Sequence, residues 1–170
     1  MKLAEAIQAL KNIIRTGWMQ HGLKIAESVA EHSFEAALLA LELAFVAGVD
    51  AERAATLALV HDVPEAIIGD IPKWTSERVR RVDAEAVKEI ESDKIAELFI
   101  EFEEGKSSEA KIARLCDLLA TNLQARRYMK QGYNVIDIEE KTRKEIVGML
   151  EDEVLKSIRE KVMELMQSEK

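Results

Sequence analysis

Leu57-Ala58-Leu59-Val60-His61-Asp62 is an apolar helical run that ends in a polar pair, in a chain with only three histidines. A second histidine, His32, lies in the apolar stretch 28–34, and Asp117 interrupts a later amphipathic stretch. Two imidazoles and two carboxylates that project inward from three helices form the kind of ligand set that a divalent metal ion requires. The sequence therefore predicts a metal site within a helical core.

The alternative for these residues is an ordinary helical core. A histidine on an apolar helix face is most often a hydrogen-bonded core residue. Asp62 and Asp117 would each cost several kcal/mol if they were buried without a partner, and few cationic residues occupy matching core positions. One cation would neutralise both carboxylates. The spacing alone, however, leaves a metal site and an ordinary helical core evenly balanced.

The composition favours one helical domain. The chain has 170 residues, of which 48% are hydrophobic and 33% charged, as is typical of a folded globular protein. Seven Gly and two Pro leave few turn positions, which disfavours a sheet-rich fold. We expect an all-α single domain over residues 1–170, with a metal-binding core over about 10–135 and a C-terminal helix over about 138–167.

Capping signals divide the chain into helices. Ser28 and Glu31 fit a capping box, Asp50 fits an N-cap, and Ser107 or Ser108 fits another. A loop is expected over residues 16–27, which contain two Gly and no clean apolar period. Helices are predicted at 2–14, 28–47, 51–62, 76–104 (as one or two helices), 108–131 and about 138–167.

Charge and hydropathy limit the partners and the location. The net charge of -8 argues against binding to a nucleic-acid polymer, because such surfaces gather Lys and Arg. The longest apolar stretch, 36–49, is interrupted by Glu42 and is too short to span a membrane. We expect no signal peptide, because the first residues become polar at once. The lone Cys116 excludes an internal disulfide and favours the cytoplasm.

The order His32, His61-Asp62, Asp117 resembles the ligand order of the HD-domain metal phosphohydrolases. Residues 15–18 (Arg-Thr-Gly-Trp), 27–33, 61–72 and 102–111 resemble the 5′-deoxynucleotidase branch of that family, so the resemblance covers roughly residues 10–135. The His-Asp doublet alone is a weak signal, whereas the run from Glu65 to Pro72 is more specific. The resemblance implies an HD-domain helical bundle, a homodimer, and release of phosphate from deoxyribonucleoside 5′-monophosphates.

The same resemblance makes His32, His61, Asp62 and Asp117 the ligands of one divalent ion. Two imidazoles and two carboxylates suit Mn, Co, Fe, Ni or Zn. Neighbouring residues on a helix point about 100° apart, so His61 and Asp62 can both bind the ion only near a helix end. Pro64 makes a helix end at this position plausible.

Glu65 follows Asp62 by three residues and would lie on nearly the same helix face. The resemblance gives Glu65 a catalytic role, which we interpret as general acid/base assistance. The alternative is a solvated carboxylate in the turn after Pro64.

The substrate contacts rest on the resemblance alone. It assigns Asp70 to the sugar 3′-hydroxyl and places Trp18 against C2′ of the sugar. The alternatives are turn capping for Asp70 and a core position for Trp18. Some relatives carry Arg immediately before this Trp, where this chain has Gly17, so Arg15 and Lys73 are candidates for the phosphate by position only.

Two other functions fit the sequence. The chain could be another HD-type enzyme that cleaves a nucleoside triphosphate, a cyclic nucleotide or an alarmone. It could also be a non-enzymatic interaction protein whose helices a metal stabilises, although neither Glu65 nor Asp70 is needed for a structural site.

Overall fold

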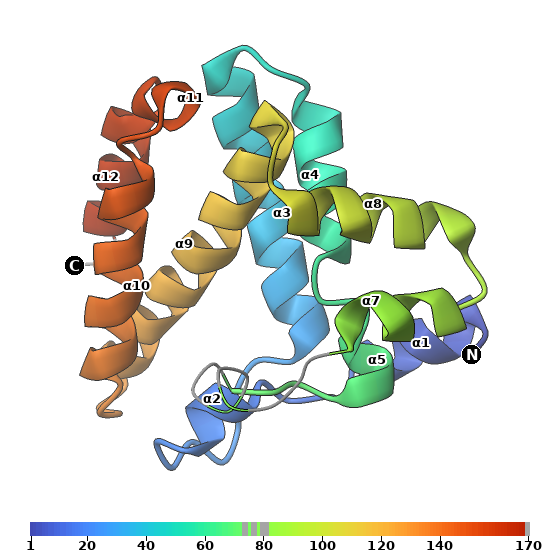
Figure 1. Ribbon diagram of the computed structural model, residues 1–170. Helices are drawn as coiled ribbons and strands as arrows, with labels where there is room; N and C mark the ends of the chain where they lie inside the picture. The colour runs from blue at the N-terminus through green and yellow to red at the C-terminus, as the bar shows by residue number, and fades with distance from the viewer. Residues whose placement is uncertain (73–74, 76–77, 79–81, 169–170) are drawn as a thin grey trace.

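The computed structural model describes residues 1–168 apart from 73–74, 76–77 and 79–81, and every regular element in that part is a helix (Figure 1). An isolated antiparallel bridge joins Ile14 to Ser28. The all-α prediction is confirmed. The elements are α1 (Leu3–Leu10), α2 (Thr16–Met19), α3 (Val29–Ala47), α4 (Ala51–Val60), α5 (Glu65–Ile68), α7 (Asp83–Ala86), the 3₁₀ helix η1 (Val87–Glu89), α8 (Asp93–Glu104), α9 (Ser108–Lys130), α10 (Ile136–Met149), α11 (Glu153–Lys156) and α12 (Arg159–Ser168).

The starts of the central helices follow from their capping residues. The Ser28 side chain accepts the N–H of Glu31, and the Glu31 carboxylate accepts the N–H of Ser28 at 2.7 Å, so the predicted capping box is present. Asp50 caps α4, and Ser107 rather than Ser108 caps α9. Gly48 ends α3 with a φ of 72°, a left-handed conformation that glycine adopts without strain.

Helices α3, α4 and α9 form the centre of the molecule, with α10 and α12 along one flank and α8 along the other (Figure 1). Ala36, Ala40 and Ala44 are fully buried at helical spacing on α3. Small side chains at such positions let neighbouring helices approach closely. His32 lies one turn before Ala36 on the same buried face, so the packing that builds the core also turns His32 inward.

Three local predictions differ from the structure. The first helix ends at Leu10, and the segment expected as a loop over 16–27 contains the short helix α2. The single C-terminal helix expected over about 138–167 is wrong, because the segment is divided into α10, α11 and α12. The Asp152 side chain accepts the N–H of Val154 and starts a new helix, while Lys111 of α9 pairs with Asp152 at 2.8 Å.

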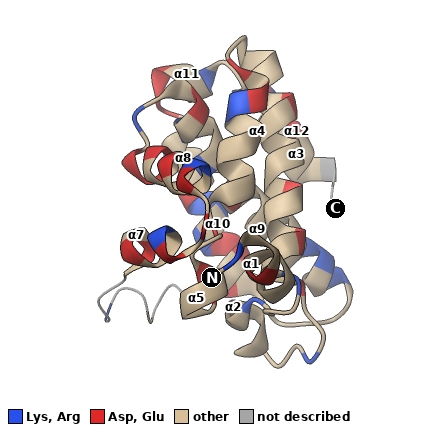
Figure 2. Ribbon diagram, turned by 90° about the vertical axis from the view of Figure 1, so that its right-hand side faces the viewer, with Lys and Arg blue, Asp and Glu red and all other residues tan. Residues whose placement is uncertain are grey.

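The charged segment before α9 agrees in part with expectation. Its described portion forms α7, η1 and α8, and α8 ends at Gly105 as predicted. Figure 2 marks acidic residues along α7 and α8, with a few basic residues among them. Within the described part of the chain, no helix combines the length and apolar character needed to cross a membrane.

Candidate metal centre

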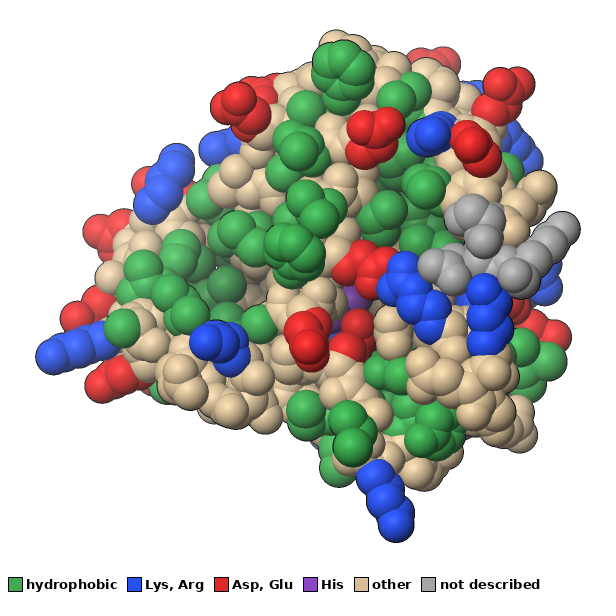
Figure 3. Space-filling view, turned by 180° about the vertical axis from the view of Figure 1, so that it is seen from behind, with side chains coloured by type: hydrophobic (Ala, Val, Ile, Leu, Met, Phe, Trp, Pro, Cys, Tyr) green, Lys and Arg blue, Asp and Glu red, His purple; other side chains and the backbone are tan. Residues whose placement is uncertain are grey.

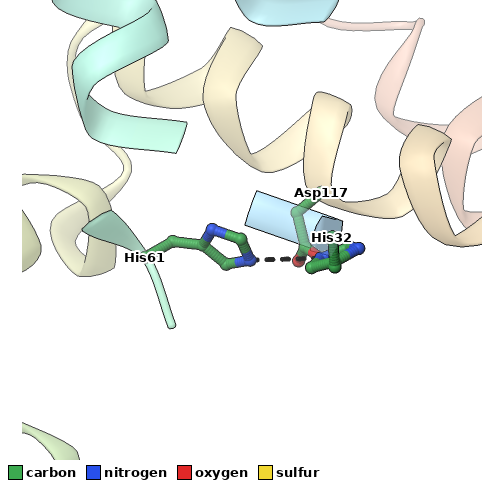
Figure 4. A group of neighbouring side chains, drawn as sticks. All are labelled: His32, His61 and Asp117. Carbon is green, nitrogen blue, oxygen red and sulfur yellow. Dashed lines mark hydrogen bonds and ion pairs between the residues drawn. The ribbon is translucent and has the colours of Figure 1, made fainter. Parts of the chain in front are cut away.

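Four of the side chains singled out in the sequence meet at one point between α3, the end of α4, and α9. His32 Nε2 lies 3.1 Å from Asp117 Oδ1, and His61 Nε2 lies 3.6 Å from the same oxygen. Asp62 Oδ2 lies 3.1 Å from His61 Nε2 and 3.9 Å from His32 Nε2. Figure 4 shows His32, His61 and Asp117 pointing toward one another. The ligand atoms of these three lie within 4.8 Å of one another.

The end of α4 allows His61 and Asp62 to face the same point. Helix α4 ends at Val60, and residues 61–64 form a turn before α5. The backbone tightens there into a turn in which the N–H of Val63 donates to the carbonyl of Val60, while His61 keeps helical dihedral angles (φ -60°, ψ -33°). The sequence argument for a helix end at this position therefore agrees with the backbone.

The donor atoms fit a cation. His61 Nδ1 lies 2.6 Å from the carbonyl of Ala58, and because a carbonyl only accepts, Nδ1 carries a proton and Nε2 is the ligating nitrogen. His61 Nε2 is buried and has no hydrogen bond of good geometry to any described residue, although two carboxylates lie within 4 Å. An imidazole nitrogen that faces two carboxylate oxygens in this way is a ready ligand for a divalent metal.

The charges of the cluster are strongly coupled. Burial opposes the charged form of His61, but Asp62 and Asp117 outweigh it and raise the pKa of His61 well above its usual range. Burial also opposes ionisation of Asp62, yet His61 and Arg15 lower its pKa to about 2. The pKa of Asp117 is likewise held well below its usual range by His32 and His61, against its burial. A metal ion would replace the proton that His61 holds between the carboxylates.

Arg15 supports the cluster from the side. Its guanidinium donates to Asp62 at 3.0 Å and to the Thr121 hydroxyl at 3.3 Å, and its Nε lies 3.6 Å from Glu27. Burial opposes the charge on Arg15, but Asp62 and Glu27 prevail and raise its pKa. Arg15 was a candidate for the substrate phosphate by position, and the structure places it against Asp62, one of the predicted ligands.

Trp18 is 2% exposed, and its ring packs edge-on against Tyr128 with 5.1 Å between centroids. Its Nε1 donates to Glu27 at 2.9 Å. This is the arrangement of a core tryptophan, the alternative that the sequence left open. The residue also borders a cavity next to the cluster.

Glu65 and Asp70 lie at the start of α5 and just after it, and both line a cavity beside the cluster. Glu65 is 6% exposed, and its Oε2 has no hydrogen-bond partner among the described residues. Burial, with the nearby charges of Asp62 and Asp70, raises the pKa of Glu65 to about 10. Asp70 Oδ2 accepts from the N–H of Thr16 at 2.6 Å and also from its hydroxyl, so it anchors α2.

Two cavities open onto the cluster, and both are lined by Asp62, Arg114, Asp117 and Leu118. One, of about 590 Å³, extends toward α8 and α10. The other, of about 520 Å³, contains Trp18, Glu65 and Asp70 in its wall. The structure thus brings together every predicted site residue except Lys73, which lies outside the described residues.

Sequence reasoning missed several cavity residues. Arg114 and Thr121 lie three residues before and four residues after Asp117, so helical spacing places both on its face of α9. That spacing is a signal that could have found them. Lys141, on α10, also lines the second cavity, and nothing local in the sequence ties α10 to the cluster.

Comparison with known proteins identifies the family. The model of the HD domain family matches residues 7–158. The 5′-deoxynucleotidase hdd1 of Schizosaccharomyces pombe is 29% identical over 152 residues, covering 81% of this chain and 76% of that protein. The human 5′-deoxynucleotidase HDDC2 is 32% identical over 138 residues, covering 75% of this chain and 67% of that protein. The chain belongs to the HD domain family and is an HD-domain phosphohydrolase.

Solved structures agree with this assignment. A conserved hypothetical protein from Pyrococcus furiosus has a TM-score of 0.85 at 29% identity, covering 97% of this chain and 98% of that one. The cyanophage S-2L HD phosphohydrolase DatZ, solved with dA and one catalytic Zn²⁺ ion, has a TM-score of 0.74 at 20% identity, covering 99% of this chain and 98% of that one. At 20% sequence identity, the similarity to DatZ shows a shared fold.

Proposed function

We propose that this protein is a metal-dependent 5′-deoxynucleotidase that hydrolyses deoxyribonucleoside 5′-monophosphates to deoxynucleoside and phosphate. The observation that carries the proposal is the convergence of His32, His61, Asp62 and Asp117 at the junction of two cavities, beside a buried Glu65. The names of the relatives support the substrate class.

The proposed ligands are the two imidazoles and two carboxylates of the cluster, and the proposed ion is one of Mn, Co, Fe, Ni or Zn. When bound, such an ion would offset the charge of the phosphate group and lower the pKa of the attacking water. Arg15 holds the Asp62 carboxylate in place through the 3.0 Å hydrogen bond, and the Glu27 carboxylate, 3.6 Å from Arg15 Nε, holds Arg15 in turn.

Glu65 is the proposed general acid. Burial keeps a proton on its carboxyl group at neutral pH. A carboxylic acid that holds its proton at neutral pH can donate it to the 5′-oxygen as the phosphate ester bond breaks. The resemblance gives Glu65 a catalytic role, which we interpret as acid or base assistance, and the burial of its carboxyl group favours the acid.

The second cavity is the proposed nucleoside site. Trp18 forms an apolar wall against C2′ of the sugar, and we assign Asp70 to the 3′-hydroxyl. A ribonucleotide would bring its 2′-hydroxyl against the indole face, which itself offers no hydrogen-bond acceptor. Burying a hydroxyl without a partner costs roughly 1–3 kcal/mol, so the deoxyribonucleotide should be preferred by about 5- to 150-fold. Arg15 and Lys73 stay the proposed phosphate contacts.

We propose a single domain over residues 1–170 that acts in the cytoplasm as a homodimer, with small-molecule nucleotides and not nucleic-acid polymers as substrates. The lone Cys116 is fully buried and its pKa is raised by burial and by Asp117, so its thiol is not poised for redox chemistry.

A substrate panel tests the proposed function. Metal-stripped protein is supplied with Mn²⁺ or Co²⁺ and assayed for phosphate release from deoxyribonucleoside and ribonucleoside 5′-monophosphates. Nucleoside 3′-monophosphates, nucleoside triphosphates and cyclic nucleotides serve as comparison substrates. We expect phosphate release chiefly from the deoxyribonucleoside 5′-monophosphates. Preference for a triphosphate or a cyclic nucleotide would assign the chain to another HD-type reaction, and no hydrolysis by fully metallated protein would favour a structural role.

A further inference from the structure

Helix α3 presents an apolar face on the side opposite His32. Its inner face is buried against α4 and α9. Apart from Glu31 and Glu42, every exposed residue of α3 is apolar. Phe34 (61% exposed), Leu38 (52%), Leu41 (41%) and Phe45 (76%) point to that side and form what we name the outer α3 face. Figure 3 shows hydrophobic side chains running as a band up the rear of the molecule, where α3 lies.

The spacing on this face is that of a helix–helix seam. Phe34, Leu38, Leu41 and Phe45 follow one another at steps of four, three and four residues. Alternating steps of three and four keep apolar side chains in one line along a helix that packs against another helix. The order Phe-Leu-Leu-Phe, with these steps, also reads the same from either end. A stripe with this symmetry matches its own copy when the second helix runs in the opposite direction.

We propose that the outer α3 face is the contact between two copies of this chain, with the two α3 helices antiparallel about a two-fold axis between residues 39 and 40. Phe34 of one protomer then lies level with Phe45 of its partner, and Leu38 with Leu41. Both ends of the seam form the same contact, as a closed two-fold dimer requires.

The charged residues of α3 favour the antiparallel arrangement of the two helices. About that axis, Glu42 lies level with Ala37 of the second copy, and Glu35 with Ala44. Parallel helices in the same register would instead place each glutamate level with its own copy, where like charges repel. Antiparallel helix dipoles also oppose each other favourably. Glu35 is moreover neutralised by Arg127, whose guanidinium lies 2.7 Å away.

The exposed apolar area matches the need of a dimer. An aromatic side chain covers roughly 200 Å², so Phe34 and Phe45 together expose roughly 270 Å². Leu38 and Leu41 bring the apolar area of the face to roughly 440 Å². A standard interface buries about 800 Å² per partner, of which about 60% is apolar. The outer α3 face therefore supplies about the apolar area of one side of such an interface.

Sedimentation velocity of the full chain, over a range of concentrations, tests the proposal. We expect the wild-type protein to sediment as a dimer. The double substitution Phe34→Glu with Phe45→Glu places like charges opposite each other at both ends of the seam and should weaken dimerisation by at least about a hundredfold. The control Ile7→Glu, at a 51% exposed apolar residue of α1, should leave the dimer intact.

A second variant keeps two charged side chains and reverses the sign of one of them. Phe34→Lys with Phe45→Glu places a lysine opposite a glutamate if the helices are antiparallel, and should dimerise more tightly than the double glutamate variant. In a parallel pair the same variant would place lysine against lysine. Circular dichroism confirms that each variant is folded before it is compared. A wild-type monomer at every concentration, a double glutamate variant that still dimerises, or equal weakening of both double variants would overturn the proposal.

Discussion

Replacing the buried Glu65 by glutamine should change how the stability of the metal-free protein depends on pH. Burial raises the pKa of Glu65 from the ordinary value of 4.5 to about 10 in the folded protein. At any pH between these two values, Glu65 therefore takes up a proton when the chain folds. The unfolded chain binds fewer protons in this window, and the free energy of unfolding therefore falls as pH rises. Glutamine keeps the shape of the side chain and has no proton to take up.

The size of the effect follows from linkage. One proton taken up on folding changes the free energy of unfolding by about 1.4 kcal/mol per pH unit. Between about pH 5.5 and pH 8.5 the Glu65→Gln variant should therefore gain roughly 4 kcal/mol relative to wild type. Both the wild type and the Glu65→Gln variant contain His61, so the contribution of its titration cancels, to first order, in the difference between their free energies of unfolding.

Urea unfolding in the presence of a chelator, at several pH values, measures this difference. The exposed Glu91, changed to Gln, is the matched control and should follow the wild-type curve. The reasoning is refuted if the Glu65→Gln and wild-type curves stay parallel from pH 5.5 to pH 8.5, because Glu65 would then be ionised in both the folded and the unfolded protein.

Four further predictions concern the metal and the reaction. His61→Ala should lose both the metal and the activity, and stoichiometric metal with normal turnover in this variant would remove His61 from the ligand set. Because the pKa of His61 is raised, metal and proton compete for its Nε2, so the apparent metal affinity should rise about tenfold per pH unit near neutrality; calorimetry that shows no pH dependence and no proton release would contradict this. Glu65→Gln in the metallated enzyme should keep the ion and slow hydrolysis by about 10²- to 10⁴-fold, and a loss below about threefold in kcat would reject the acid role. Trp18→Ala should lower the ratio of kcat/KM for a deoxyribonucleotide over the matching ribonucleotide, provided that the variant stays folded despite the loss of a buried ring; an unchanged ratio would mean that the sugar is read elsewhere.

Signals within one or two helical turns were readable from the sequence. The capping box of Ser28 and Glu31 and the cap at Asp50 depend only on neighbouring residues, and both are present. The position of His61 and Asp62 at a helix end followed from the geometry of adjacent residues and from Pro64.

Pairings between distant residues could not be read in the same way. The division of the C-terminal segment depends partly on the ion pair of Asp152 with Lys111, 41 residues earlier in the chain. Arg15 reaches Asp62 across 47 residues, so its place beside a predicted ligand needs the tertiary fold. The burial of Trp18 likewise depends on Tyr128 of α9.

We propose that the cluster of His32, His61, Asp62 and Asp117 binds the metal ion on which a 5′-deoxynucleotidase reaction depends. Titration of metal-stripped protein with Mn²⁺, with phosphate release from a deoxyribonucleoside 5′-monophosphate as the readout, tests it most directly. We predict no activity without metal and a rise to a plateau at one bound ion per chain. Full activity in the stripped protein, or one tightly bound ion per chain with no phosphate release, would contradict the claim.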